Sequence, residues 1–229
     1  MASSSPPAAG SRDEPGSPSL SVLASSLSSK GHKLISLLKK TGGLSSPLCS
    51  SLYQEVVLSL NSLGMKYLSV KKLGEAKSYL DKASNLTSDP SIVSQTLCSS
   101  TTTTTTTTTT NNNNNNNDST SSSAPGSEAG VLCGASHSKG PTSIVGLRVL
   151  TLNNLSCYYK SMSDLTSARS HLLTAISLSR HNSAITSGEK AVSHSNMSAV
   201  LSAMDDHVGA RKHAKIAVGY CKEDLKRFR

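Results

Sequence analysis

The feature of this sequence that most restricts its fold is a pattern of large and small apolar residues that occurs three times. The central copy consists of Leu152, Leu155, Tyr159, Ala168, Leu172 and Ala175. The same offsets give an upstream copy of Leu60, Leu63, Tyr67, Ala76, Leu80 and Ala83. Downstream they give His194, Met197, Leu201, Ala210, Ala214 and Ala217. Self-similarity at fixed spacing predicts a repeat architecture, in which each unit buries its apolar face against a neighbour.

Each copy is predicted to be a pair of helices, because apolar residues recur at helical spacing and start and stop signals flank them. Ser46-Pro47 is a typical N-cap followed by Pro in the first turn, and Thr186-x-x-Glu189 is a capping box. No segment carries a convincing strand signal, so the fold class is all-α. The predicted helices span about 20–40 (interrupted at Gly31), 47–70, 73–86, 142–160, 164–179, 188–204 and 206–228.

The pattern resembles the tetratricopeptide repeat (TPR), a helix-turn-helix unit of about 34 residues. The resemblance covers residues 57–90, 149–182 and 191–224. Leu63-Gly64 lies on signature positions of the first unit, the second has Ser156 in place of the Gly, and the third is weaker. The LNNL motif and the spacing of 42 residues (197 − 155 = 42) are similar to the kinesin-light-chain-like subgroup. The resemblance implies an α-solenoid of about three TPR-like hairpins.

Low-complexity sequence divides the chain. Residues 1–19 and 99–140 are rich in Ser, Pro, Gly, Thr and Asn and have little apolar surface to bury, so we expect both to be disordered. The parts between are an N-terminal helical region, 20–98, and a second region, 141–229. The first and second copies are 92 residues apart (155 − 63 = 92), so the 99–140 segment is expected to be an insertion between consecutive hairpins.

The candidate binding residues lie on the first helix of each pair, which the resemblance places along a concave groove. Amide side chains can donate and accept hydrogen bonds at once, so a column of them could pair with an extended peptide backbone. In the alternative interpretation, these amides are only solvated or tie helices together. The predicted peptide-binding residues are Asn61, Ser62, Met65, Asn153, Asn154, Lys160 and Asn196.

A clamp for terminal carboxylates is not expected. Related repeats that capture such groups carry Lys and Arg at particular first-helix positions. Apart from Asn154, which fits, those positions hold other residues here: Asn61, Met65, Val192 and Asn196.

The sequence predicts a non-catalytic, cytoplasmic protein-protein interaction module that needs no cofactor. No phosphate loop, metal set or nucleophile–base pair is evident, and Cys133 and His137 form only half of a zinc pattern. The five cysteines are irregularly spaced, which is typical of a reducing compartment. The partner would be a protein or peptide, with no specific nucleic acid and no transmembrane segment.

Three alternatives stay open. The net charge of +9 is compatible with a basic tether for nucleic acid or an anionic membrane, and an enzyme with an unseen site is a further possibility. Apolar residues on the last helix also suggest self-association or a larger assembly: Ile216, Val218, Leu225 and Phe228.

Overall fold

A computed structural model of the chain describes residues 19–44, 46–89 and 143–227. Within these ranges the regular structure is entirely helical, with no strand, which confirms the all-α fold class. The helices are α1 (Leu20–Thr41), α2 (Pro47–Ser69), α3 (Leu73–Ser88), α5 (Ile144–Ser161), α6 (Leu165–Arg180), α7 (Ser187–Ala203) and α8 (His207–Arg227).

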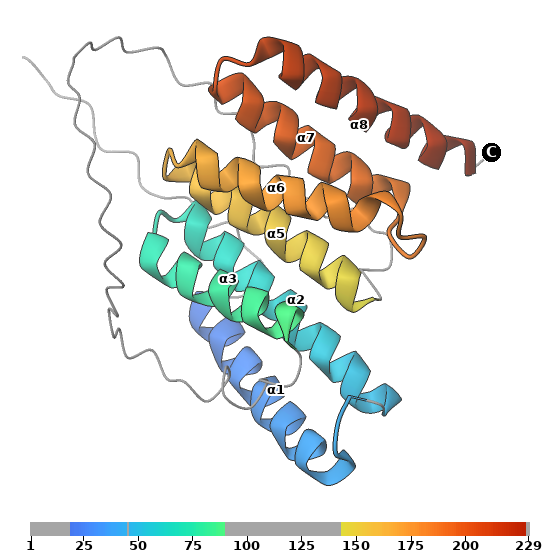
Figure 1. The fold of residues 1–229 in the computed structure, drawn as a ribbon. Coiled ribbons are helices and arrows are strands. Elements are labelled where there is room, and N and C mark those ends of the chain that lie inside the picture. The colour runs from blue at the N-terminus through green and yellow to red at the C-terminus, as the bar shows by residue number, and fades with distance from the viewer. Residues whose placement is uncertain (1–18, 45, 90–142, 228–229) are drawn as a thin grey trace, which may run out of the picture.

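The helices pack in the order of the chain, from α1 at one end to α8 at the other (Figure 1). Each contacts the one before it, and α2–α3, α5–α6 and α7–α8 are the three pairs that the sequence predicts. In addition, α5 contacts both α2 and α7. The first helices of the three pairs therefore lie side by side, and any surface that they share runs across α2, α5 and α7.

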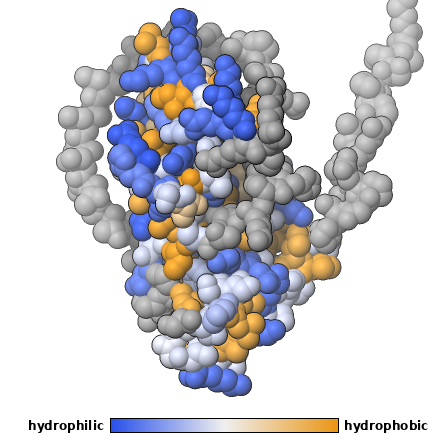
Figure 2. All heavy atoms as spheres, turned by 90° about the vertical axis from the view of Figure 1, so that its right-hand side faces the viewer, coloured by the Kyte–Doolittle hydropathy of each residue, from blue (hydrophilic) through white to orange (hydrophobic). Residues whose placement is uncertain are grey.

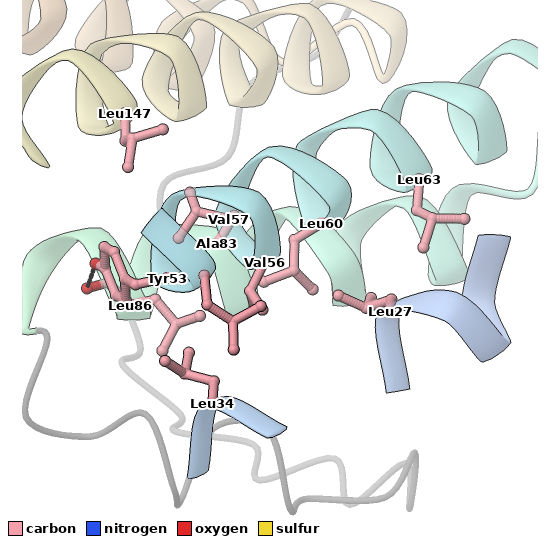
Figure 3. Packing of buried hydrophobic residues seen from close by; sticks show 11 residues of the cluster. Leu27, Leu34, Tyr53, Val56, Val57, Leu60, Leu63, Ala83, Leu86 and Leu147 are labelled. Atoms are coloured by element: carbon pink, nitrogen blue, oxygen red, sulfur yellow. Dashed lines mark hydrogen bonds between the residues drawn. The ribbon is translucent and has the colours of Figure 1, made fainter. Parts of the chain in front are cut away.

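The largest apolar cluster joins α1, α2, α3 and the start of α5 (Figure 3). Leu34 of α1 and Leu147 of α5 are fully buried on opposite sides of α2. The hydroxyl of Tyr53 donates a hydrogen bond of 2.6 Å to the carbonyl oxygen of Leu86, and burial raises the pKa of Tyr53 to about 12. A buried phenol with a partner fixes the α2–α3 pair without leaving a polar atom unsatisfied.

The small residues of the repeated pattern let the helices of a pair approach closely. A Cβ atom added at Gly64 would lie 2.7 Å from Cγ of Leu80, a distance that real side chains do not tolerate. The equivalent positions in the next pair are Ser156 on α5 and Leu172 on α6, and both are buried. The Ser156 hydroxyl is satisfied within α5, because it donates to the carbonyl oxygen of Asn153 at 2.6 Å.

The predicted helix starts are only partly confirmed in detail. The capping box of α7 is present, with Thr186 accepting from the Glu189 amide and Glu189 accepting from the Thr186 amide. Pro47 occupies the first turn of α2 as expected, but the Ser46 hydroxyl makes no capping hydrogen bond. The expected interruption at Gly31 is wrong: α1 continues through it, because Gly31 is buried.

Several expectations lie outside the described residues. These are the disorder of 1–18 and of 99–140, the continuation of the first region over 90–98, and the Cys133–His137 pair. Among the helices that the structure describes, none combines the length and the apolar character required to cross a bilayer.

On the face drawn in Figure 2, hydrophilic side chains gather at the end of the molecule where α8 lies, while apolar side chains form separate patches.

Candidate functional site

The asparagines that the sequence singles out form hydrogen bonds between first helices. At the α2–α5 boundary, the amide nitrogen of Asn61 donates to the carbonyl oxygen of Val57 at 3.0 Å and to the hydroxyl of Thr151 at 2.9 Å. Its oxygen accepts from the amide nitrogen of Asn154 at 2.8 Å. Asn61 is 2% exposed, so its amide is satisfied inside the protein. We call this set the amide relay.

The same relay recurs at the α5–α7 boundary. The amide nitrogen of Asn153 donates to the carbonyl oxygen of Val149 at 2.9 Å and to the hydroxyl of Ser193 at 2.8 Å. Its oxygen accepts from the amide nitrogen of Asn196 at 3.0 Å. Asn153 is 4% exposed. The two α2 residues correspond to residues 92 positions later on α5, and the two α5 residues correspond to residues 42 positions later on α7. These are the spacings of the repeat, so both boundaries have the same hydrogen-bonding pattern.

The relay shows that Asn61 and Asn153 are buried between helices, as in the alternative interpretation. Asn61 and Asn153 each donate once to a carbonyl oxygen of their own helix and use the other donor and the acceptor across the boundary, which is the arrangement in which amides tie helices together. Freeing such a buried amide for a ligand would cost the hydrogen bonds that it already makes. Asn154 and Asn196 are half-buried and each donates once, so each keeps further hydrogen-bonding capacity.

A groove of about 1050 Å³ lies between α2 and α5. Its walls are in register, because Leu58 faces the groove with Leu150, and three further pairs have the same separation of 92 residues in sequence. These pairs are Ser62 with Asn154, Met65 with Cys157, and Ser69 with Ser161. The remaining lining residues are on α2 (Asn61, Lys66 and Leu68), in the α2–α3 turn (Lys71) and at the start of α3 (Leu73).

The groove gathers only part of the predicted site. Four of the predicted residues line it, namely Asn61, Ser62, Met65 and Asn154. The other three do not: Asn153 and Asn196 belong to the α5–α7 relay, and Lys160 is on α5 but outside the lining. The apolar walls are absent from the predicted site, although the separation of 92 residues that pairs Leu58 with Leu150 was available in the sequence.

The charge of the groove is one-sided. Among the described residues that line it, Lys66 and Lys71 are the only ionisable ones apart from the thiol of Cys157, and none carries a carboxylate. The ion pairs Lys30–Glu55 and Lys77–Asp81 involve neither groove lysine, so within the part of the chain that the structure describes neither lysine is neutralised by an ion pair. Both lie near the C-terminal end of α2, and a bound anion would meet them there.

A second polar cluster lies between α7 and α8. His194 takes the place of Leu60 and Leu152 in the repeated pattern, and its Nδ1 is 2.9 Å from Nδ1 of His213. The two rings stack with centroids 5.0 Å apart. Burial, with the nearby His213 and Arg180, lowers the pKa of His194 to about 4. Burial and the neighbouring Lys212 also lower the pKa of His213, so both shifts favour a neutral pair in which one ring donates to the other.

The described residues contain no group of three or more His, Cys, Asp or Glu side chains that could hold a metal ion. Their buried side-chain nitrogen and oxygen atoms all have hydrogen-bond partners. The groove combines apolar walls, amides, hydroxyls and two ammonium groups, which are groups that bind a ligand by contact.

Comparison with known proteins supplies no relative, since the chain matches no family model, no curated protein and no solved structure.

Proposed function

We propose that this protein is a non-catalytic interaction module of the tetratricopeptide type, and that it binds a peptide segment in the groove between α2 and α5. The proposal rests on one observation: two first helices present matched walls to one groove of about 1050 Å³. The three helix pairs and the repeated amide relay support a solenoid arrangement, in which such grooves follow the first helices.

The relay supports the proposal indirectly. It holds α2 and α5 together through buried hydrogen bonds, so the groove is formed before any ligand arrives. Binding to a preformed surface avoids the free-energy cost of ordering its walls. An extended peptide could then use Ser62 and the spare capacity of Asn154 for its backbone, and the leucine walls for its side chains.

The test is selection from a displayed library of random peptides with the full chain, followed by affinity measurement on the recovered sequences. Ser62→Trp places a large ring in the groove from an exposed position and removes no buried contact. We expect it to weaken binding at least tenfold. The matched control is Ser170→Trp, which adds the same ring to an exposed position on α6 and should leave affinity within about twofold.

Two results would contradict the proposal. One is equal binding by the two tryptophan variants, which would place the peptide elsewhere on the molecule. The other is recovery of no peptide, together with tight binding of polyanions that falls steeply with salt and ignores Ser62→Trp. That result would favour the basic tether.

A further inference from the structure

We infer that the segment bound in the α2–α5 groove carries an acidic side chain three or four residues away from a large apolar one, with the acidic residue at the Lys66–Lys71 end. This inference rests on the proposed function and names the chemistry of its ligand. It depends on where the charges and the leucines of the groove lie along α2.

The acidic requirement follows from charge complementarity. Lys66 and Lys71 line the groove, neither has an ion-pair partner among the residues that the structure describes, and no carboxylate lines the groove to neutralise them. Beside apolar walls the effective dielectric constant is lower than in bulk water, so a ligand carboxylate would gain more from each ammonium group than at an open surface. An amide or hydroxyl in its place would gain less.

A pair of lysines in the turn after the first helix is present in the first hairpin alone among the three. The turn between α2 and α3 holds Lys71 and Lys72. The corresponding turn between α5 and α6 holds Ser163 and Asp164, and the turn between α7 and α8 holds two aspartates, Asp205 and Asp206. The turn of the first hairpin would thus attract a ligand acid more strongly than the other two turns, even with Lys160 in the last turn of α5, and this difference favours the first hairpin as the binding site.

The spacing follows from helix and chain dimensions. Leu58 and Leu150 face the groove as a pair. On α2, Leu58 lies eight residues before Lys66. At about 1.5 Å per residue, that is about 12 Å along the helix. An extended peptide advances about 3.3 Å per residue and covers this length in three to four residues. The part of the groove along α2, from Leu58 to Ser69, accommodates about five extended residues by the same conversion.

The test uses three synthetic peptides with blocked ends, so that no terminal carboxylate contributes. The first has one Leu and two Glu placed three and four residues after it. The second replaces both Glu with Gln. The third keeps the composition of the first but sets the two Glu directly beside the Leu. Affinity for the full chain is measured by fluorescence anisotropy, at low and at physiological salt.

We expect the first peptide to bind about tenfold more tightly than the second and several-fold more tightly than the third. The double variant Lys66→Gln/Lys71→Gln should abolish the preference for Glu over Gln and leave the affinity for the Gln peptide unchanged. The matched control Lys72→Gln/Lys160→Gln removes the same net charge from nearby positions that do not line the groove, and it should keep the preference.

Three outcomes overturn the inference: equal affinity of wild type for the Glu and Gln peptides, equal loss of preference in the two lysine variants, or no effect of the Leu–Glu spacing. The first outcome would mean that the groove does not distinguish acidic from amide side chains. The second would mean that acidic peptides are attracted only by the net charge of +9. If Ser62→Trp still weakens all three peptides in those cases, the groove binds peptides and only its acidic preference is wrong. If Ser62→Trp weakens none, the proposed function itself fails.

Discussion

The α2–α5 and α5–α7 boundaries share the amide relay but differ in what surrounds it. At the first, the relay borders a groove with leucine walls and two lysines. At the second, the position equivalent to Leu150 is Val192, and the positions equivalent to Cys157 and Ser161 are both alanines, Ala199 and Ala203. The common element therefore serves the joint between helices, and the chemistry that could distinguish ligands lies in the residues that change from one boundary to the next.

The largest expected effect comes from breaking a relay. Asn153→Ala removes two donated hydrogen bonds and leaves the Asn196 amide and the Ser193 hydroxyl without their buried partner. We expect a loss of about 3 kcal/mol in the free energy of unfolding, measured in urea. The control Asn85→Ala, at an exposed position on α3, should change it by less than about 0.5 kcal/mol.

If the two boundaries share one hydrogen-bonding pattern, Asn61→Ala at the α2–α5 boundary should lower the free energy of unfolding by a similar amount. A cost below about 1 kcal/mol for either variant would mean that the relay contributes little.

The second effect compares the third hairpin with the first two, where leucine stands in place of His194. Because the folded pKa of His194 is about 4 and the ordinary value is 6.5, the unfolded chain takes up the proton first as pH falls. Stability should therefore be constant above about pH 6.5 and fall between 6.5 and 4, by about 2 kcal/mol. Asp206 opposes this trend by favouring the charged form of His213, while Lys212 and Arg180 reinforce it.

The measurement is urea unfolding at several pH values in wild type and His194→Leu. The variant restores the residue that the other two hairpins carry, and most of the fall in stability between pH 6.5 and 4 should disappear. An unchanged pH dependence in the variant would assign the effect to other groups.

A smaller effect distinguishes the first hairpin from the second. Gly64→Ala places a Cβ atom against Cγ of the buried Leu80, so we expect a loss of about 1.5 kcal/mol in the free energy of unfolding. The control Gly74→Ala adds the same atom on α3 where nothing lies within 4 Å, and it should be neutral or stabilising, since alanine favours helix. Equal stability of the two variants in urea unfolding would show that the hairpin can open to accept the extra carbon.

The smallest effect compares two helix starts. Thr186 accepts a capping hydrogen bond at the start of α7, whereas the Ser46 hydroxyl makes none at the start of α2. Thr186→Ala should lower the free energy of unfolding by about 1 kcal/mol, and Ser46→Ala should lower it by a few tenths at most. A cost for Ser46→Ala as large as that for Thr186→Ala would mean that Ser46 caps α2 in solution.

Local sequence signals were enough to predict most of the described helices. Thr186 and Glu189 announce α7 because a capping box needs only residues three positions apart. The expected interruption at Gly31 was wrong because glycine only weakly disfavours helix, and α1 is held on either side of it by Leu27 and Leu34, which are buried against α2.

The candidate site was harder to predict because it depends on distant residues. Whether Asn61 points to solvent or to the interior is decided by Thr151, 90 residues away, which supplies the buried acceptor. The pattern that places Asn153 beside Leu152 does not distinguish an exposed amide from one that is buried and satisfied. Lys71 is not among the predicted site residues, because it lies in the α2–α3 turn and the prediction relied on the periodicity of helices.

The contact between the first two hairpins has a consequence for how the length of the sequence between them can vary. Side chains on α2 and α5 fix that joint, although 55 residues of sequence separate Ser88 from Ile144. The homopolymer stretches Thr101–Thr110 and Asn111–Asn117 lie in this interval, so a change in their length would alter none of the side chains that form the joint.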